Sequence, residues 1–163
     1  MIIKLKNKDT LKFGNFKIKC AIGLGGLKKN KLEGDKSTPR GLYKLGDLYW
    51  RPDRLKKPVT KLKCIRIKKN MGWCNDIKSK YYNKRIFINK KYRHEKLFRR
   101  DHKYDCLIVV KYNYQNTIKG IGSAIFIHLT KNYKKTAGCI ALKKNDFLVL
   151  AKIINNKTKI NLN

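Results

Sequence analysis

The chain has 163 residues, of which 42% are hydrophobic, so it is long enough to bury the core of one domain and too apolar to be disordered. Its 42 Lys and Arg residues against 10 Asp and Glu give a formal net charge of +32. A field of this size attracts polyanions, but the lysines are spread from Lys4 to Lys159 instead of forming one patch. We therefore interpret the charge as a composition bias on solvated faces. Non-specific polyanion binding is the alternative, and no specific nucleic-acid partner is expected.

The sequence shows no targeting, membrane or cofactor motif. The segment from Met1 to Lys8 lacks the apolar core of a signal peptide, and no apolar run is long enough to span a bilayer. Gly23, Gly25 and Gly26 lack the spacing of a dinucleotide fingerprint, and no Walker-type loop occurs. We expect no transmembrane segment, no cofactor and a monomeric protein.

The five cysteines are Cys20, Cys64, Cys74, Cys106 and Cys139, and no two of them form a C-x-x-C pair. A zinc ribbon or a thioredoxin motif is therefore not supported. A zinc site could be drawn from His94, His102 and Cys106, but both histidines lie in a Lys/Arg-rich stretch typical of solvated side chains. We expect no metal site, and the odd number of cysteines leaves at least one thiol free.

Apolar residues alternate with a period of two along much of the chain, which predicts strands rather than helices. The predicted strands cover residues 3–5, 11–13, 16–22, 64–68, 85–89, 107–112, 124–130, 139–142 and 158–162. The first three are expected to be antiparallel, with tight turns at Lys8-Asp9 and Gly14-Asn15.

One helix is predicted over residues 145–154, with Asn145 as its cap and a buried stripe formed by Phe147, Leu150, Ala151 and Ile154. Residues 43–83 contain both tryptophans and two of the three prolines, and look loop-rich enough to wall one side of a cleft. Many short strands with one late helix predict a mainly β fold, a β-sandwich or an open barrel, in a single domain over residues 1–163.

Residues 122–142 carry the most informative chemistry. His128 ends an apolar strand, and Cys139 directly follows Gly138. Alternation places Ala124, Phe126 and His128 on one face of the first strand, and Cys139 with Ala141 on one side of the second. If the two strands are neighbours, the imidazole and the thiol can meet.

A thiol needs a nearby base or cation to become a nucleophilic thiolate, and His128 is the candidate. Gly138 permits a positive φ, so the N–H groups of Gly138 and Cys139 could bind an oxyanion. The residues alone leave a structural alternative open. A buried cysteine is often only a small hydrophobe, and a histidine at a strand end is often hydrogen-bonded structurally.

The run from Gly122 to Leu142 resembles the catalytic motif of the L,D-transpeptidase catalytic domain (YkuD-like) family. That motif is a His, a spacer, and then Ser/Thr-x-Gly-Cys-Ile/Val; here His128 is followed by seven residues and then by Thr136-Ala137-Gly138-Cys139-Ile140. Further resemblance to the small single-domain branch lies in Gly23-Leu24-Gly25-Gly26, residues 31–41 with their Thr38-Pro39-Arg40-Gly41 turn, Gly72-Trp73-Cys74-Asn75-Asp76, Tyr82-Asn83, Glu95-Lys96-Leu97 and Tyr104-Asp105.

The resemblance implies a mainly β enzyme with Cys139 as nucleophile and His128 as base. Its implied partner is a peptidoglycan tetrapeptide stem, cleaved before its terminal D-alanine through a Cys thioester. The amine of a second stem then resolves this thioester; water as acceptor would make the enzyme an L,D-carboxypeptidase. The resemblance also implies action in the cell envelope or periplasm, although no signal peptide is visible and a cytoplasmic location stays open.

Further site residues are expected around this pair. Thr136, Ser123, Trp73 and Tyr82 are candidates for substrate binding, and the two aromatic residues could equally anchor loop packing. Many family members carry His two residues before the cysteine and Arg two residues after it, where this chain has Ala137 and Ala141. A rival from another class is a basic binding module, on nucleic acid or wall polymer, in which Cys139 is inert.

Overall fold

The structure is a computed structural model that describes all of residues 1–163. Its strands and single helix are β1 (Ile2–Lys6), β2 (Thr10–Phe13), β3 (Phe16–Lys19), β4 (Leu27–Lys28), β5 (Thr38–Pro39), β6 (Leu42–Trp50), β7 (Cys64–Arg66), β8 (Met71–Cys74), β9 (Arg85–Phe87), β10 (His94–Lys96), β11 (Cys106–Val110), β12 (Phe126–Leu129), β13 (Ile140–Leu142), α1 (Lys144–Ile153) and β14 (Lys159–Asn161). The fold is mainly β, as predicted.

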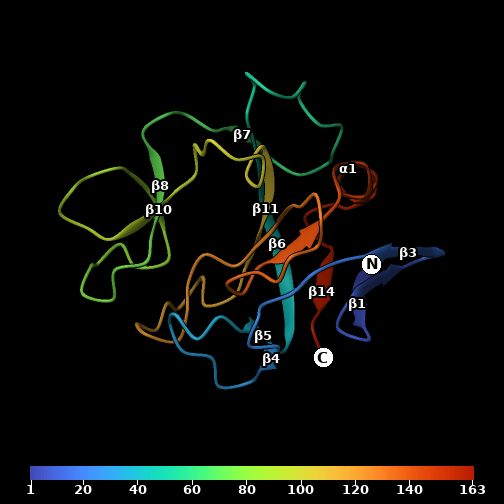
Figure 1. Cartoon of the computed structure of the whole chain (residues 1–163), viewed down its shortest axis with the longest axis horizontal. Helices are drawn as coiled ribbons and strands as arrows, with labels where there is room; N and C mark the ends of the chain where they lie inside the picture. Colours follow the sequence, from blue (N-terminus) through green and yellow to red (C-terminus); the bar gives the residue numbers. More distant parts are fainter.

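The main sheet has nine strands in the order β13-β12-β11-β6-β14-β1-β2-β3, with β7 beside β6. Figure 1 shows β6 and β11 at the centre of the molecule, with the N-terminal hairpin on one side of them. Beyond β3, Ala21 forms a bridge with Ala141, and Gly23 forms one with Thr136. The chain thus returns from the last strand of the sheet to its first, and the sheet curls into a nearly closed barrel.

The side chains on the two faces of the sheet pack into two separate apolar clusters. Ile108, Ile127 and Ile140 belong to a large cluster that also holds the buried stripe of α1, with Phe147, Leu150, Ala151 and Ile154 all fully buried. The opposite face packs into a smaller cluster that contains Tyr49, Trp73, Leu97, Tyr104, Leu107, Val109, Phe126 and Cys139. The predicted two-faced alternation of the strands and the predicted helix stripe are therefore confirmed.

A second sheet of three strands, in the order β10-β8-β9, covers the smaller cluster. It lies on the far side of β6 and β11 from the N-terminal hairpin (Figure 1). Asn83 joins this sheet to the loops around it, because its side chain accepts hydrogen bonds from Trp73 Nε1 (2.9 Å) and Ala124 N (3.0 Å) and donates to the carbonyls of Tyr112 and Asn113.

The prediction of a loop-rich segment over residues 43–83 was wrong for its first part. β6 is the longest strand and pairs with β11, β14 and β7. Its register against β11 shifts between Ile108 and Val110, so Gly46-Asp47 form an irregularity that breaks the period-two pattern. The small sheet also takes β8 from this segment.

Two local details also differ from the predictions. α1 begins after Lys143, which makes no side-chain cap, so Asn145 lies inside the helix and is not its cap. The first hairpin turn covers residues 7–9, one residue more than the predicted Lys8-Asp9, and Asn7 and Lys8 have φ of 51° and 60°. No helix of the structure has the length and apolarity needed to cross a membrane.

Candidate active site

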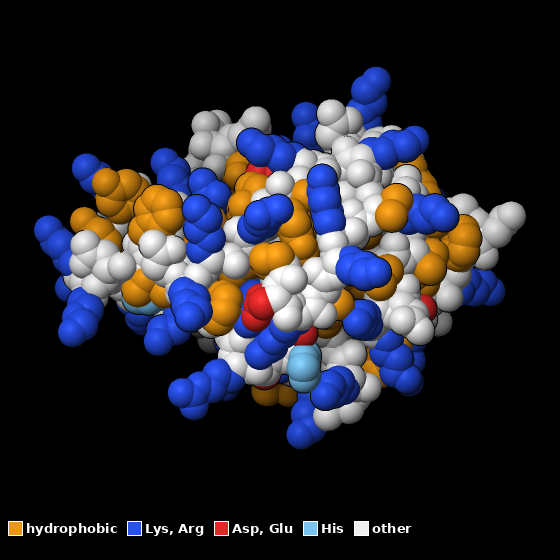
Figure 2. All heavy atoms as spheres, turned by 90° about the horizontal axis from the view of Figure 1, so that it is seen from above, with side chains coloured by type: hydrophobic (Ala, Val, Ile, Leu, Met, Phe, Trp, Pro, Cys, Tyr) orange, Lys and Arg blue, Asp and Glu red, His pale blue; other side chains and the backbone are white.

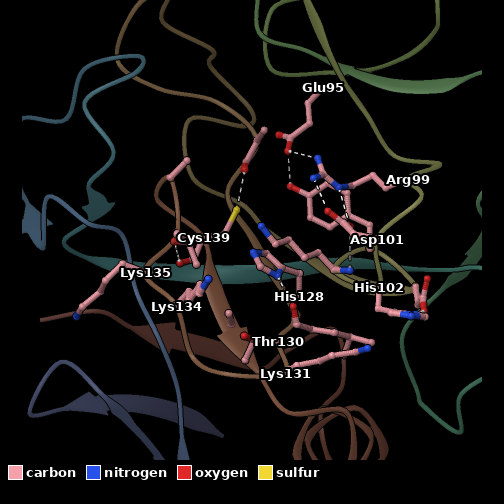
Figure 3. Close-up of a pocket in the computed structure, with 18 of the residues that line it drawn as sticks. Glu95, Arg99, Asp101, His102, His128, Thr130, Lys131, Lys134, Lys135 and Cys139 are labelled. Carbon is pink, nitrogen blue, oxygen red and sulfur yellow. Dashed lines mark hydrogen bonds and ion pairs between the residues drawn. The ribbon is translucent and has the colours of Figure 1, made fainter.

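His128 lies on β12, and Cys139 directly precedes the adjacent strand β13. β12 and β13 are parallel neighbours, with Ile127 opposite Ile140 and His128 opposite Ala141. The isoleucines point into the large cluster, so the thiol and the imidazole both point away from it. Both side chains line one cavity of about 1300 Å³, shown in Figure 3.

The thiol of Cys139 is held by backbone groups. Its Sγ donates to the carbonyl oxygen of Ala124 (3.2 Å) and lies 3.4 Å from the N–H of Phe126. Ala124 has a φ of 53°, a left-handed conformation that is uncommon outside glycine and aims its carbonyl at the thiol. Cys139 is 7% exposed, and burial raises the pKa of its thiol to about 12.

His128 is oriented by the next backbone carbonyl. Its Nδ1 lies 2.9 Å from the carbonyl oxygen of Leu129, which can only accept, so Nδ1 carries the proton and Nε2 is the basic nitrogen. Burial lowers the pKa of His128 to about 4. Burial opposes the charged form of both groups, so the two pKa shifts favour a neutral thiol beside a neutral imidazole over an ion pair.

The turn before Cys139 is fixed by contacts to the segment around β5. Gly138 has a φ of 137°, and a Cβ at this position would lie 2.7 Å from the carbonyl oxygen of Ser37. Thr136 stabilises the turn, because its hydroxyl accepts a hydrogen bond from Gly138 N (3.1 Å) and donates one to Cys139 O (2.6 Å). The N–H of Cys139 makes no intramolecular hydrogen bond. Of the two amides expected to bind an oxyanion, the one of Cys139 is thus free and the one of Gly138 is engaged by Thr136.

The cavity lining carries an excess of basic side chains. Its Lys and Arg residues are Lys31, Lys36, Arg54, Arg99, Arg100, Lys103, Lys131, Lys134, Lys135 and Lys144. Lys131, Lys134 and Lys135 come from the loop between β12 and β13 and line the same cavity as the thiol and the imidazole (Figure 3). Over the face drawn in Figure 2, Lys and Arg are distributed across the whole surface, with few acidic side chains among them.

The family model of the L,D-transpeptidase catalytic domain (YkuD) matches residues 3–162. The chain belongs to this family. No curated protein matches the chain.

Solved structures show the same fold. The helical cell shape determining protein Pgp2 from Campylobacter jejuni matches with a TM-score of 0.55 and 19% identity, over 98% of this chain and 46% of that one. Its K307A mutant matches with a TM-score of 0.53 and 20% identity, over 98% of this chain and 45% of that one. The chain thus spans just under half the length of these two proteins.

Within this L,D-transpeptidase domain, two of the four expected substrate-binding residues line the cavity. Thr136 lies there with its hydroxyl engaged in the turn, and Ser123 lies there with its hydroxyl donating to Glu33 Oε2 (2.7 Å). Trp73 and Tyr82 do not line the cavity, and each is only 2% exposed. Their indole and phenol groups are bonded to Asn83 and Glu33, so they support the walls of the site instead of offering a free aromatic face.

The cavity is also lined by residues that reasoning from the sequence had not assigned to the site. Glu33 and Glu95 are the only glutamates in the chain, and both line the cavity. Each accepts a hydrogen bond of 2.5 Å from a tyrosine hydroxyl, Tyr82 and Tyr104 respectively. The sequence signal that could have indicated these two residues is that a chain with so many basic residues contains only two glutamates.

The segment that carries Tyr104 is held by two side-chain contacts to Asp105. Arg54 Nη1 lies 2.7 Å from Asp105 Oδ1, and His102 Nδ1 lies 2.8 Å from Asp105 Oδ2. His102 is therefore paired with a carboxylate at the cavity edge, while Cys106 is fully buried in the large cluster. All five cysteines are free thiols, so no disulfide holds this region.

Proposed function

We propose that this chain is a cysteine L,D-transpeptidase that acts on peptidoglycan stem peptides through a thioester at Cys139. The observation that carries the proposal is the placement of His128 on β12 and of Cys139 directly before the parallel neighbouring strand β13, with both side chains lining one cavity. The hydrogen bond from Nδ1 to Leu129 O adds to it, because it leaves Nε2 as a proton acceptor. Family membership supports the class of reaction.

In the first step, His128 Nε2 takes the proton of Cys139 as the sulfur attacks the carbonyl carbon before the terminal D-alanine. The negative charge moves to the carbonyl oxygen, and the free N–H of Cys139 is placed to donate to it. The C–N bond then breaks, the departing amine takes the proton from His128, and a thioester remains on the enzyme.

In the second step, the side-chain amine of another stem attacks the thioester. His128 accepts a proton from this amine, the C–S bond breaks, and the sulfur regains a proton as the new amide leaves. Water in place of the amine would release a tripeptide stem, the L,D-carboxypeptidase outcome.

The charge of the lining supports an anionic substrate. Ala137 and Ala141 stand where basic residues are common in the family, so no cation directly flanks Cys139 in sequence. The basic loop side chains Lys131, Lys134 and Lys135 border the same cavity and form no ion pair. They would attract the carboxylates of a stem peptide. An enzyme with such a substrate would act at the cell wall.

The test is incubation of the protein with purified disaccharide-tetrapeptides, followed by mass spectrometry. Cross-linked dimers are expected from wild type and no change from Cys139→Ala. Cys64→Ala is the matched control, because Cys64 is half-buried in β7 and outside the cavity lining, and it should behave as wild type.

Other outcomes separate the alternatives. Tripeptides without dimers would assign the carboxypeptidase reaction. Unchanged tetrapeptides with wild type, together with salt-sensitive binding to anionic polymers, would favour the basic binding module.

A further inference from the structure

Glu33 is the one carboxylate of the cavity lining that has no cationic partner. Each of the other acidic side chains there lies 2.6–3.8 Å from an arginine: Glu95 and Asp101 from Arg99, and Asp105 from Arg54. Glu33 forms no ion pair, and the nearby Lys31 is bound to Asp35 Oδ1 at 2.6 Å instead. The cavity thus offers one unpaired negative charge among many basic side chains.

Buried groups hold the Glu33 carboxylate in one orientation. Its Oε2 accepts hydrogen bonds from the hydroxyls of Tyr82 (2.5 Å) and Ser123 (2.7 Å), two residues that are 2% and 7% exposed. Its main-chain N–H donates to Gly120 O at 2.7 Å. The second oxygen, Oε1, accepts no hydrogen bond from the protein and is not buried, so it is left for a ligand.

The same contacts place Glu33 close to the nucleophile. Ser123, which donates to Glu33, directly precedes Ala124, and the carbonyl oxygen of Ala124 accepts the hydrogen bond of the Cys139 thiol at 3.2 Å. The carboxylate and the sulfur are therefore attached to one short stretch of backbone, and both residues line the cavity. The part of a substrate near the attacked carbonyl is thus the part that Glu33 meets.

An unpaired carboxylate suits a cation, and the cation of a stem peptide is its side-chain amine. A carboxylate favours the protonated form of a neighbouring amine, and a protonated amine cannot attack a thioester. Glu33 therefore suits an amine that keeps its charge while the thioester forms. That amine belongs to the donor stem, which carries it because donor and acceptor are two copies of the same stem.

We propose that Glu33 is a specificity-determining residue of this site: its Oε1 binds the side-chain ammonium of the donor stem while Cys139 attacks the carbonyl carbon. Lys131, Lys134 and Lys135 would attract the carboxylates of the same stem, so the lining offers both signs of charge to a substrate that carries both. This inference rests on the proposed function.

The test is the release of D-alanine in a single turnover, with enzyme in excess over a disaccharide-tetrapeptide whose side-chain amine is either free or acetylated. Wild type should release D-alanine at least about tenfold faster from the free-amine stem, as expected for a hydrogen bond between charged groups. Glu33→Gln keeps an acceptor for Tyr82 and Ser123 but removes the charge, and it should release D-alanine from both stems at equal rates. A steric effect of the acetyl group would persist in this variant.

Asp47→Asn is the matched control. Asp47 also forms no ion pair, but it lies on β6 outside the cavity lining. Its loss removes the same charge from the chain, and the variant should keep the wild-type preference for the free-amine stem.

Other results would overturn the inference and leave the proposed function intact. A folded Glu33→Gln protein that still prefers the free-amine stem would do so. Unchanged D-alanine release with fewer cross-linked dimers would also do so, because it would assign Glu33 to the acceptor. Equal rates with the two stems in wild type would have the same consequence, and this measurement needs no variant to fold. Absence of D-alanine release by wild type from either stem would overturn the proposed function itself.

Discussion

Thr38 Oγ1 donates a hydrogen bond of 2.8 Å to the carbonyl oxygen of Gly138, a residue 100 positions later in the chain. The same hydroxyl accepts a hydrogen bond of 2.9 Å from the N–H of Gly23. Thr38 is fully buried, so neither partner can turn to water when the hydroxyl is lost. One side chain of β5 therefore fixes the turn that presents Cys139.

Thr38→Val is expected to destabilise the protein, because the shape is kept while two buried backbone groups lose their partner. Each such group costs about 1–3 kcal/mol. Urea unfolding should show the loss, and alkylation of Cys139 should slow as the turn loosens. Thr117→Val is the control, because its hydroxyl makes one exposed hydrogen bond of 3.3 Å. Equal stability of the two variants would contradict the role of Thr38.

Gly138→Ala tests the close approach of the same turn. The added Cβ would meet the Ser37 carbonyl at 2.7 Å, and the φ of 137° is strained for alanine, so we expect a loss above about 3 kcal/mol. Gly120→Ala is the matched control, since Gly120 has a φ of 87° but no atom within 4 Å of an added Cβ. It should cost only the backbone strain, about 1–2 kcal/mol. Thermal unfolding of both variants measures the difference, and equal losses would show that the contact with Ser37 does not matter.

The sequence was sufficient to predict the strands of the site because alternation is a local property. His128 and Cys139 each lie on the predicted face, and their sequence neighbours Ile127 and Ile140 lie on the other. The sequence was insufficient to predict β6, because an irregularity at Gly46-Asp47 interrupts the period-two alternation of that strand. Tyr104 and Glu95 were missed because they meet only through the pairing of β10 with β8 and the packing of the smaller cluster. For Trp73 and Tyr82 the sequence left substrate binding and loop packing both open, because burial of an aromatic residue cannot be judged from its neighbours in sequence, and the structure shows packing.

His128 should make stability depend on pH. Its pKa falls from 6.5 to about 4 on burial. Between these values the unfolded chain binds a proton at this histidine and the folded protein does not, so acidification favours unfolding. From pH 7.5 to pH 4 we expect wild type to lose about 3 kcal/mol more of its free energy of unfolding than His128→Gln, at about 1.4 kcal/mol per pKa unit. Urea titrations at both pH values measure this, and equal losses in the two proteins would contradict the buried neutral imidazole.

The neutral pair also predicts how the nucleophile responds to pH. Burial raises the pKa of Cys139 to about 12 and lowers that of His128 to about 4, so neither group changes its dominant form between pH 6 and pH 9. The thiolate fraction then rises about tenfold per pH unit, and the alkylation rate of Cys139 should rise with it. A thiolate–imidazolium pair would instead give a rate that is flat over this range. Mass spectrometry of the peptide containing Cys139 measures the alkylation rate. In a separate assay, His128→Ala should lower the rate of acyl transfer to substrate, because no base remains to take the proton of Cys139. An alkylation rate of wild-type Cys139 that stays constant between pH 6 and pH 9 would contradict the neutral resting state and indicate the ion pair.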